Sequence, residues 1–155
     1  MRGRPAPKRH IPADPRFGSV VVEKLTNTIM RRGKKTIARA IVYDALEIIE
    51  EKTKQNPVEV FDTAMKNVMP IMEVRSRRVG GANYQIPIPV RAERKTALAF
   101  RWIIGAAKSS KGKPMAVKLA SEIMAAANNE GAAVKKRQDV QRMADANRAF
   151  AHFAR

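Results

Sequence analysis

Apolar residues recur at three- and four-residue spacing along most of the chain, which is the period of a buried helical face. Turn and stop residues interrupt this pattern at Arg31-Arg32-Gly33, at Pro70 and in the basic loop from Lys108 to Pro114. The pattern therefore predicts six helices, over residues 19–31, 34–54, 57–69, 92–108, 115–127 and 132–150.

Two of these helices begin at recognisable capping residues. Ser19 precedes the first helix, and Asn56 precedes Pro57, which suits a first helical turn. The predicted buried face of the second helix consists of Ile37, Ile41, Ala45, Ile48 and Ile49. One side of the last predicted helix consists of Val140, Met143, Asn147 and Phe150.

The period changes to that of a strand within residues 72–90. The alternating residues are Tyr84, Ile86, Ile88 and Val90, separated by Gln85, Pro87 and Pro89. Gly80 and Gly81 supply the turn of a β-hairpin, and the two prolines suit a ribbon with unpaired outer edges. The predicted fold is therefore mainly α, a bundle of about six helices with one protruding β-hairpin.

Residues 1–17 are predicted to form an extended basic tail, and residues 18–155 a single helical domain that contains the hairpin. Four prolines disfavour a helix in this tail. Its charged residues are Arg2, Arg4, Lys8, Arg9 and Arg16, with Asp14 as the one acid. An extended basic chain suits threading along phosphates, and the alternative is a disordered terminus.

Composition points to a polyanionic partner. The 155 residues include 31 Lys and Arg against 14 Asp and Glu, a net charge of +17 that opposes compaction unless it is neutralised. No stretch approaches the roughly 18 apolar residues that span a bilayer, and the basic start lacks the apolar segment of a signal peptide. The sequence has no cysteine, which fits a reducing cytoplasm. We therefore expect nucleic acid, and no membrane, as the partner.

The positive charge is clustered, although a merely solvated face is the alternative explanation. The clusters lie in the tail, at 31–39, at 75–78, at 91–95, at 108–118 and at 135–142. Residues 44–62 carry the opposite charge, a net −4, and are expected to face away from the nucleic acid, toward solvent or a basic partner protein. In the hairpin, Gly80 and Gly81 permit close approach of a ligand, whereas Tyr84 either stacks on a base or packs against the partner strand.

No catalytic constellation is present in the sequence. Gly33-Lys34-Lys35-Thr36 lacks the earlier glycine of a phosphate-binding loop, because position 28 is Thr. His10 and His152 have no partner at metal-ligand spacing, so each is expected to contact phosphate or solvent. We therefore predict a protein that is not an enzyme and that has neither a cofactor nor a metal site.

The segment NVMPIMEVRSRRVGGANYQIP at residues 67–87 resembles the signature of the small-subunit ribosomal protein S-seven family, of bacterial or organellar type. Further segments that resemble this family are PKRHIPADPRFGS at 7–19, RRGKKTIA at 31–38, FDTAMKN at 61–67, AVKKR at 133–137 and MADANRAFAHF at 143–153. The resemblance therefore extends over essentially the whole chain.

This resemblance implies a structural role in translation. Family members have a helical body with a protruding ribbon, bind the 3′ major domain of 16S-type ribosomal RNA and nucleate assembly of the subunit head. They lie near the exit-site tRNA, the mRNA path and neighbouring small-subunit proteins. The RNA-binding residues that the resemblance implies are Arg2, Arg4, Lys8, Arg9, Arg31, Arg32, Lys34, Lys35, Arg75, Arg77, Arg78, Arg94, Lys95, Lys113, Met115, Lys135, Lys136 and Arg137. The ribbon tip on the tRNA side comprises Gly80 and Gly81, with Tyr84 close by.

The expected location is the cytoplasmic ribosome, with an organellar ribosome as the alternative. Two other functions are alternatives to this prediction. One is a helical DNA-binding or architectural protein. The other is a metal-independent nuclease, which no group of residues in the sequence supports. Some bacterial relatives also repress translation of their own messenger, a role that the sequence leaves open.

Overall fold

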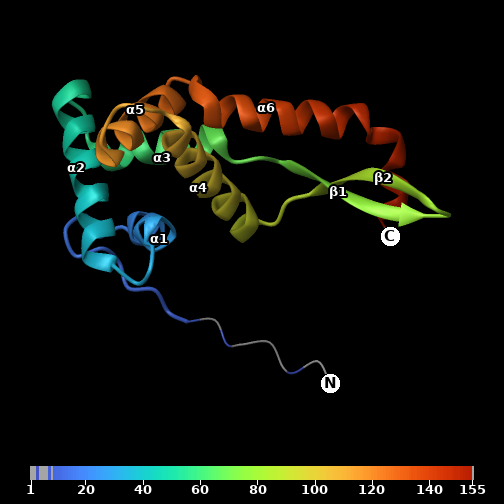
Figure 1. The fold of residues 1–155 in the computed structure, drawn as a ribbon, viewed down its shortest axis with the longest axis horizontal. Coiled ribbons are helices and arrows are strands. Elements are labelled where there is room, and N and C mark those ends of the chain that lie inside the picture. The colour runs from blue at the N-terminus through green and yellow to red at the C-terminus, as the bar shows by residue number, and fades with distance from the viewer. Residues whose placement is uncertain (1–2, 4–6, 8, 155) are drawn as a thin grey trace.

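The computed structural model describes residues 3, 7 and 9–154. Within this range the elements in chain order are α1 (Val20–Ile29), α2 (Lys35–Thr53), α3 (Pro57–Val68), β1 (Met72–Val79), β2 (Ala82–Pro89), α4 (Ala92–Ser109), α5 (Met115–Ala127), α6 (Gly131–Ala146) and the 3-10 helix η1 (Arg148–Ala154). Helices α1 to α5 gather at one end, and the ribbon of β1 and β2 projects away from them alongside α6 (Figure 1). The predicted fold, mainly helical with one hairpin, is confirmed.

The core forms around α5, which packs against α2, α3 and α4. Leu119 and Ile123 of α5 are fully buried, as are Phe61 of α3, Ile49 of α2 and Ile103 of α4. Buried alanines occur on each of these helices, and their small side chains let the helix axes approach closely. This core positions α1, the α1–α2 loop, α4, α6 and the ribbon, which carry the exposed cations described below.

Local signals set the helix ends as predicted. The Ser19 hydroxyl accepts a hydrogen bond from the Val22 N–H (3.4 Å), and the Asn56 side-chain oxygen accepts one from the Val58 N–H (3.0 Å). Between α1 and α2, Arg32 and Gly33 adopt positive φ angles of 53° and 73°, which a continuing helix does not permit. The α1–α2 turn is therefore a tight loop with its basic residues on the outside.

The predicted buried face of α2 is wrong by about one residue. The buried residues are Ala38, Val42, Ala45, Leu46 and Ile49, whereas Ile37 is 54% exposed. Apolar residues cover more than one side of this helix. Two neighbouring apolar faces therefore show the same helical spacing, and the spacing alone does not say which of them is buried. Contact with α5 selects the stripe that contains Ala38 and Val42.

The predicted helix over 132–150 is too long, because α6 ends at Ala146. The Asn147 side-chain amide donates a hydrogen bond to the Met143 carbonyl (2.8 Å), and the chain then turns into η1. Met143, on the predicted side of this helix, is 48% exposed. Contacts of η1 with the ribbon replace the last helical turns.

The ribbon is antiparallel, and its register runs from Met72 opposite Pro89 to Val79 opposite Ala82. Gly80 and Gly81 connect the strands with φ angles of 58° and 94°, the conformation of the tight hairpin turn that glycine favours. In the part of the chain that the structure describes, β1 and β2 pair with each other and with no third strand, as the prolines predicted.

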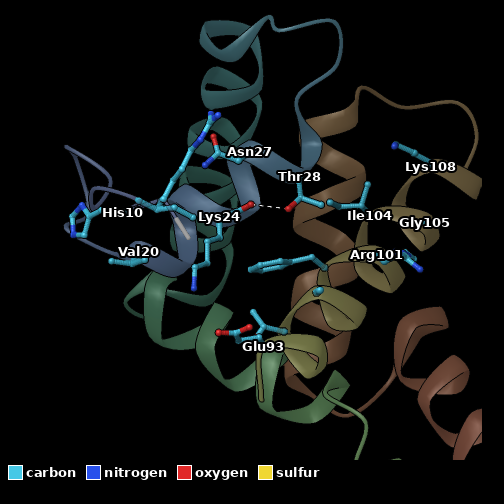
Figure 2. A pocket seen from close by; sticks show the side chains of 15 residues that line it. His10, Val20, Lys24, Asn27, Thr28, Glu93, Arg101, Ile104, Gly105 and Lys108 are labelled. Carbon is cyan, nitrogen blue, oxygen red and sulfur yellow. Dashed lines mark hydrogen bonds between the residues drawn. The ribbon is translucent and has the colours of Figure 1, made fainter. Parts of the chain in front are cut away.

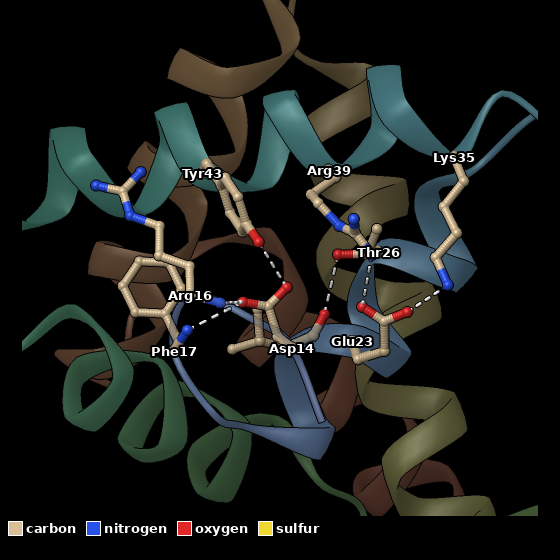
Figure 3. A network of polar contacts seen from close by, with 9 residues as sticks. Asp14, Arg16, Phe17, Glu23, Thr26, Lys35, Arg39 and Tyr43 are labelled. Carbon is tan, nitrogen blue, oxygen red and sulfur yellow. Dashed lines mark hydrogen bonds and ion pairs between the residues drawn. The ribbon is translucent and has the colours of Figure 1, made fainter. Parts of the chain in front are cut away.

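Asp14 fixes the end of the predicted tail to the helical body. Its carboxylate is 1% exposed and accepts hydrogen bonds from the backbone N–H groups of Arg16 and Phe17 (3.0 Å each) and from the Tyr43 hydroxyl (2.9 Å). Figure 3 shows this network between the tail and α2. The predicted tail of residues 1–17 is therefore attached to the body through Asp14 near its end.

Loss of the Tyr43 proton is expected to loosen this anchor at high pH. Burial, the hydrogen bond to Asp14 and the negative charge of Asp14 raise the pKa of Tyr43 above its ordinary value of 10.0. Because the folded-state pKa is the higher one, the stabilisation is complete below pH 10 and is lost as the pH rises through the folded-state pKa.

The measurement is a tyrosinate absorbance titration of a Tyr84→Phe variant, in which Tyr43 is the remaining tyrosine. We expect a midpoint above 10, and a stability difference from the further variant Tyr43→Phe that shrinks above that pH. A midpoint at or below 10 would contradict the burial and hydrogen-bonding argument.

Candidate nucleic-acid interface

The α1–α2 loop presents three exposed cations, Arg31, Arg32 and Lys34. The positive φ of Arg32 turns the chain sharply here, so neighbouring side chains diverge into solvent. Such an array can contact several phosphates of one RNA strand. Among the contacts predicted for the N-terminal tail, Arg2, Arg4 and Lys8 lie outside the described residues.

Lys35, the fourth predicted residue of this loop, is tied to a buried acid. Glu23 of α1 is 1% exposed and forms ion pairs with Lys35 and with Arg39, the latter at 3.6 Å between Oε2 and Nη2 (Figure 3). A buried carboxylate requires such partners, because desolvation of an isolated charge is costly. Glu23 therefore holds the start of α2 against α1, while one carboxylate facing two cations leaves a net positive charge at Lys35 and Arg39.

A second acid organises the base of the ribbon. Glu73 accepts hydrogen bonds from Arg75 (2.9 Å) and from Arg94 at the start of α4 (3.2 Å). Arg75 stays 67% exposed in its side chain, so it can also reach a ligand. Further along the ribbon, Arg78 is exposed. The ribbon thus combines exposed cations with a fixed attachment to the helical body.

Tyr84 packs on the C-terminal segment. Its ring centroid lies 5.1 Å from that of Phe150 and 5.4 Å from that of Phe153, while Arg77, opposite Tyr84, donates a hydrogen bond to the Phe153 carbonyl (2.6 Å). We call these four residues the ribbon clamp. The expected partner of Tyr84 was a base or the neighbouring strand, whereas the observed aromatic partners lie more than 60 residues further along the chain.

A groove of about 1260 Å³ lies between α1 and α4, with residues 9–11 along its edge. Figure 2 shows Val20 and Lys24 of α1 on one side, with Ile104 and Gly105 of α4 on the other. Four cations line it, against Glu93 as the one carboxylate among the lining residues; these cations are Arg9, Lys24, Arg101 and Lys108. The geometry therefore places a cationic rim around a partly apolar floor.

Sequence reasoning missed two of these cations, Lys24 and Arg101. Each stands alone in the sequence, outside the clusters that marked the other candidates. They come together because α1 packs against α4, a contact between segments that are distant in the sequence. For Lys24, the three- and four-residue spacing to Asn27 and Thr28, which also line the groove, was the weak available signal.

The remaining predicted residues are distributed over α4, α5 and α6. Lys113 is exposed in the loop before α5, Lys95 is half-buried, and Lys135 and Lys136 are exposed on α6. Arg137 donates a hydrogen bond to the Asn129 side chain (3.4 Å). Met115, in contrast, packs against the hydrophobic core, which limits its reach toward a ligand.

The acidic segment forms a separate surface. Asp44, Glu47, Glu50 and Glu51 are exposed on α2, and Glu47 pairs with Arg16 at 2.6 Å. A hollow of about 680 Å³ lies over this part of α2 and shares no residue with the α1–α4 groove. The acidic hollow is thus distinct from the cationic α1–α4 groove, although Arg16 of the predicted tail lies beside it.

The described residues contain no group of three or more His, Cys, Asp or Glu side chains placed to hold a metal ion. Over the same residues, each helix is too short or too polar to cross a bilayer. What the geometry offers is charge and shape: exposed cations on a loop, a ribbon and a groove.

Comparison with known proteins gives a consistent result. The profile of the family described as "Ribosomal protein S7p/S5e" matches residues 1–148. A Thermotoga maritima protein named "Small ribosomal subunit protein uS7" is 61% identical over 153 residues, which cover 99% of each chain. Proteins of the same name are 58% identical over 147 residues in Desulforamulus reducens (95% of this chain, 94% of the other) and 56% identical over 153 residues in Lactococcus lactis (99% of each).

Proposed function

Because the chain belongs to the ribosomal protein S7p/S5e family, we propose that it binds the 3′ major domain of small-subunit ribosomal RNA and nucleates assembly of the subunit head. Membership itself makes the chain a structural, non-enzymatic protein of the small ribosomal subunit that binds ribosomal RNA. The observation that supports the finer proposal is the cationic surface formed by the α1–α2 loop, the α1–α4 groove and the ribbon.

The proposed mechanism is electrostatic docking onto a folded RNA junction. Phosphates supply most of the affinity, because the exposed Lys and Arg side chains release counterions on binding. Selectivity comes from RNA shape, since side chains cannot read the deep major groove of A-form RNA. We propose residues 18–155 as one domain and residues 1–17 as a basic tail that extends along the RNA. Asp14 fixes the end of this tail to the body.

The proposed contacts fall into three groups. The tail and the α1–α2 loop contribute Arg2, Arg4, Lys8, Arg9, Arg31, Arg32, Lys34 and Lys35. The ribbon and the start of α4 contribute Arg75, Arg77, Arg78, Arg94 and Lys95. The remaining candidates are Lys113, Met115, Lys135, Lys136 and Arg137, and to these groups we add the groove residues Lys24, Arg101 and Lys108.

The ribbon tip at Gly80 and Gly81, together with the C-terminal segment, is proposed to lie near the exit-site tRNA and the mRNA path. The exposed acids of α2 then face a basic segment of a neighbouring small-subunit protein, because like charge repels phosphate. We propose the ribosome of the cytoplasm as the location.

The proposal is tested by competition between a 3′ major domain fragment of the ribosomal RNA and duplex DNA in a filter-binding assay. Preferential retention of the RNA fragment is expected, with co-sedimentation of the chain with small subunits as the second measurement. Equal or stronger binding to duplex DNA would favour an architectural DNA-binding protein.

Replacing Arg75, Arg77 and Arg78 together with Ala is expected to weaken RNA binding while the fold survives. If each side chain contacts one phosphate, the slope of log affinity against log salt falls in magnitude by about two to three. Fold stability falls only modestly, because the exposed Arg75–Glu73 pair contributes about 0–1 kcal/mol and the exposed hydrogen bond from Arg77 to the Phe153 carbonyl about 0.5–1.5 kcal/mol.

A control removes two exposed cations elsewhere, Lys52→Ala with Lys66→Ala, and the losses of affinity are compared per charge removed. This variant lowers the net charge without altering the ribbon, and its affinity is expected to change far less. Equal losses in the two variants would mean that bulk charge, rather than the ribbon, determines binding.

A further inference from the structure

The α1–α4 groove differs from an ordinary phosphate-binding surface in having an apolar floor. Ile104 and Phe100 lie at its base, and Val20 at its edge is 40% exposed. We propose that this groove takes an unpaired nucleotide of the RNA, with its base on the apolar floor and its phosphates against the cationic rim. This inference rests on the proposed function and deepens it.

The charge of the rim selects the chemical class of the occupant. Four cations against one carboxylate give the groove lining a net positive charge, which suits a polyanion and disfavours a basic protein segment. Lys24, Arg101 and Lys108 come from both helices, so the two sides of the groove can contact one bound backbone. A nucleic-acid strand fits this pattern.

The apolar floor determines which form of RNA fits. In an A-form duplex the bases are stacked and paired, so a duplex presents mainly phosphate, ribose and groove edges to a protein. An unpaired nucleotide in a loop or bulge exposes the apolar faces of its base. Contact of such a base with Val20, which is 40% exposed, removes apolar surface of both partners from water. Asn27 and Thr28 also line the groove and offer polar groups to a base edge.

Gly105 is an independent indication that the groove accommodates a ligand. It lies inside α4, where glycine is the least favourable residue after proline, yet an added Cβ would meet no described atom within 4 Å. Its backbone is helical, with no positive φ that would demand glycine. Neither packing nor backbone conformation within the described chain explains this glycine, whereas close approach of a base to the helix does.

The first test fills the groove. Gly105→Leu and Ala97→Leu each place a large side chain where the base would lie, on exposed helical positions that tolerate it. We expect the affinity for a 3′ major domain RNA fragment to fall about 5- to 150-fold, the range for loss of one base contact. Thr63→Leu on α3, exposed and outside the groove, is the matched control and should bind normally.

Gly105→Ala separates a binding role from a structural one. Alanine is a better helix former, so this variant should unfold about 2–4 °C higher than the wild type while binding the RNA fragment more weakly. A purely structural role of Gly105 would predict weaker binding only together with lower stability. Normal binding by both leucine variants would overturn the proposal.

The second test identifies the occupant. Chemical probing of the RNA fragment is expected to reveal an unpaired nucleotide that the wild type shields and Gly105→Leu does not. An abasic substitution at that nucleotide should weaken wild-type binding and have little further effect on Gly105→Leu. Independent effects of the two changes would mean that the groove contacts only the backbone, or a protein segment, and would overturn the assignment of a base. If the wild type itself does not bind the fragment, the proposed function fails and not merely this assignment.

Discussion

Raising the salt concentration from 50 to 200 mM is expected to weaken binding of the ribosomal RNA fragment by about 10³- to 10⁵-fold. This range applies to a protein that neutralises roughly six to ten phosphates. The exposed cations of the α1–α2 loop, the ribbon, α6 and the groove rim can supply that number. Because the 31 Lys and Arg exceed the 14 Asp and Glu by 17, the acids of the chain cannot neutralise all of these side chains.

The measurement is a set of binding isotherms at several KCl concentrations, with the magnesium concentration fixed so that the RNA fold does not change. As a control, a non-ionic osmolyte replaces the added salt. The ionic strength then stays constant, and the affinity of the wild type should be nearly unchanged. A flat dependence on salt would show that shape or apolar contact, rather than phosphate contact, dominates the affinity.

Asp14→Ala is expected to lower the free energy of unfolding by roughly 2–4 kcal/mol, which corresponds to a Tm lower by roughly 5–15 °C. The buried carboxylate accepts three hydrogen bonds, and alanine would leave the two N–H groups and the Tyr43 hydroxyl without this acceptor. Unpaired buried donors cost more than the net value of the bonds that were lost. RNA affinity should fall as well, because the tail loses its attachment to α2.

Two further variants calibrate this effect. Glu47→Gln breaks the exposed ion pair with Arg16 and should cost no more than about 1 kcal/mol. Asp14→Asn keeps one acceptor oxygen and should fall between the wild type and Asp14→Ala. A loss from Asp14→Ala no larger than that from Glu47→Gln would mean that the anchor contributes little.

Local sequence signals predicted the helix starts and the ribbon well. Ser19, Asn56 and Pro57 act through neighbours within three residues, and Gly80-Gly81 closes its turn without help from distant segments. The buried face of α2 failed because two stripes share one period, and the choice between them depends on α5.

Candidate cations were predictable from the sequence where they are consecutive, and were not predictable where they stand alone in the sequence. Arg31, Arg32 and Lys34 are recognisable as a cluster because adjacent charges have no core to enter. Lys24 and Arg101 line one groove only because α1 and α4 pack together. Glu23 could not be recognised as the buried partner of Lys35, because its burial follows from the packing of α1 on α2.

The ribbon clamp implies an order of events during synthesis and folding of the chain. The β1–β2 hairpin is a local structure that can form within microseconds of its own synthesis. Tyr84 and Arg77, however, find Phe150 and Phe153 only after α4, α5 and α6 have been translated. The ribbon of a nascent chain therefore lacks the clamp contacts until the C-terminal segment has been synthesised. RNA that binds before that point contacts a less constrained ribbon than RNA that binds the complete protein.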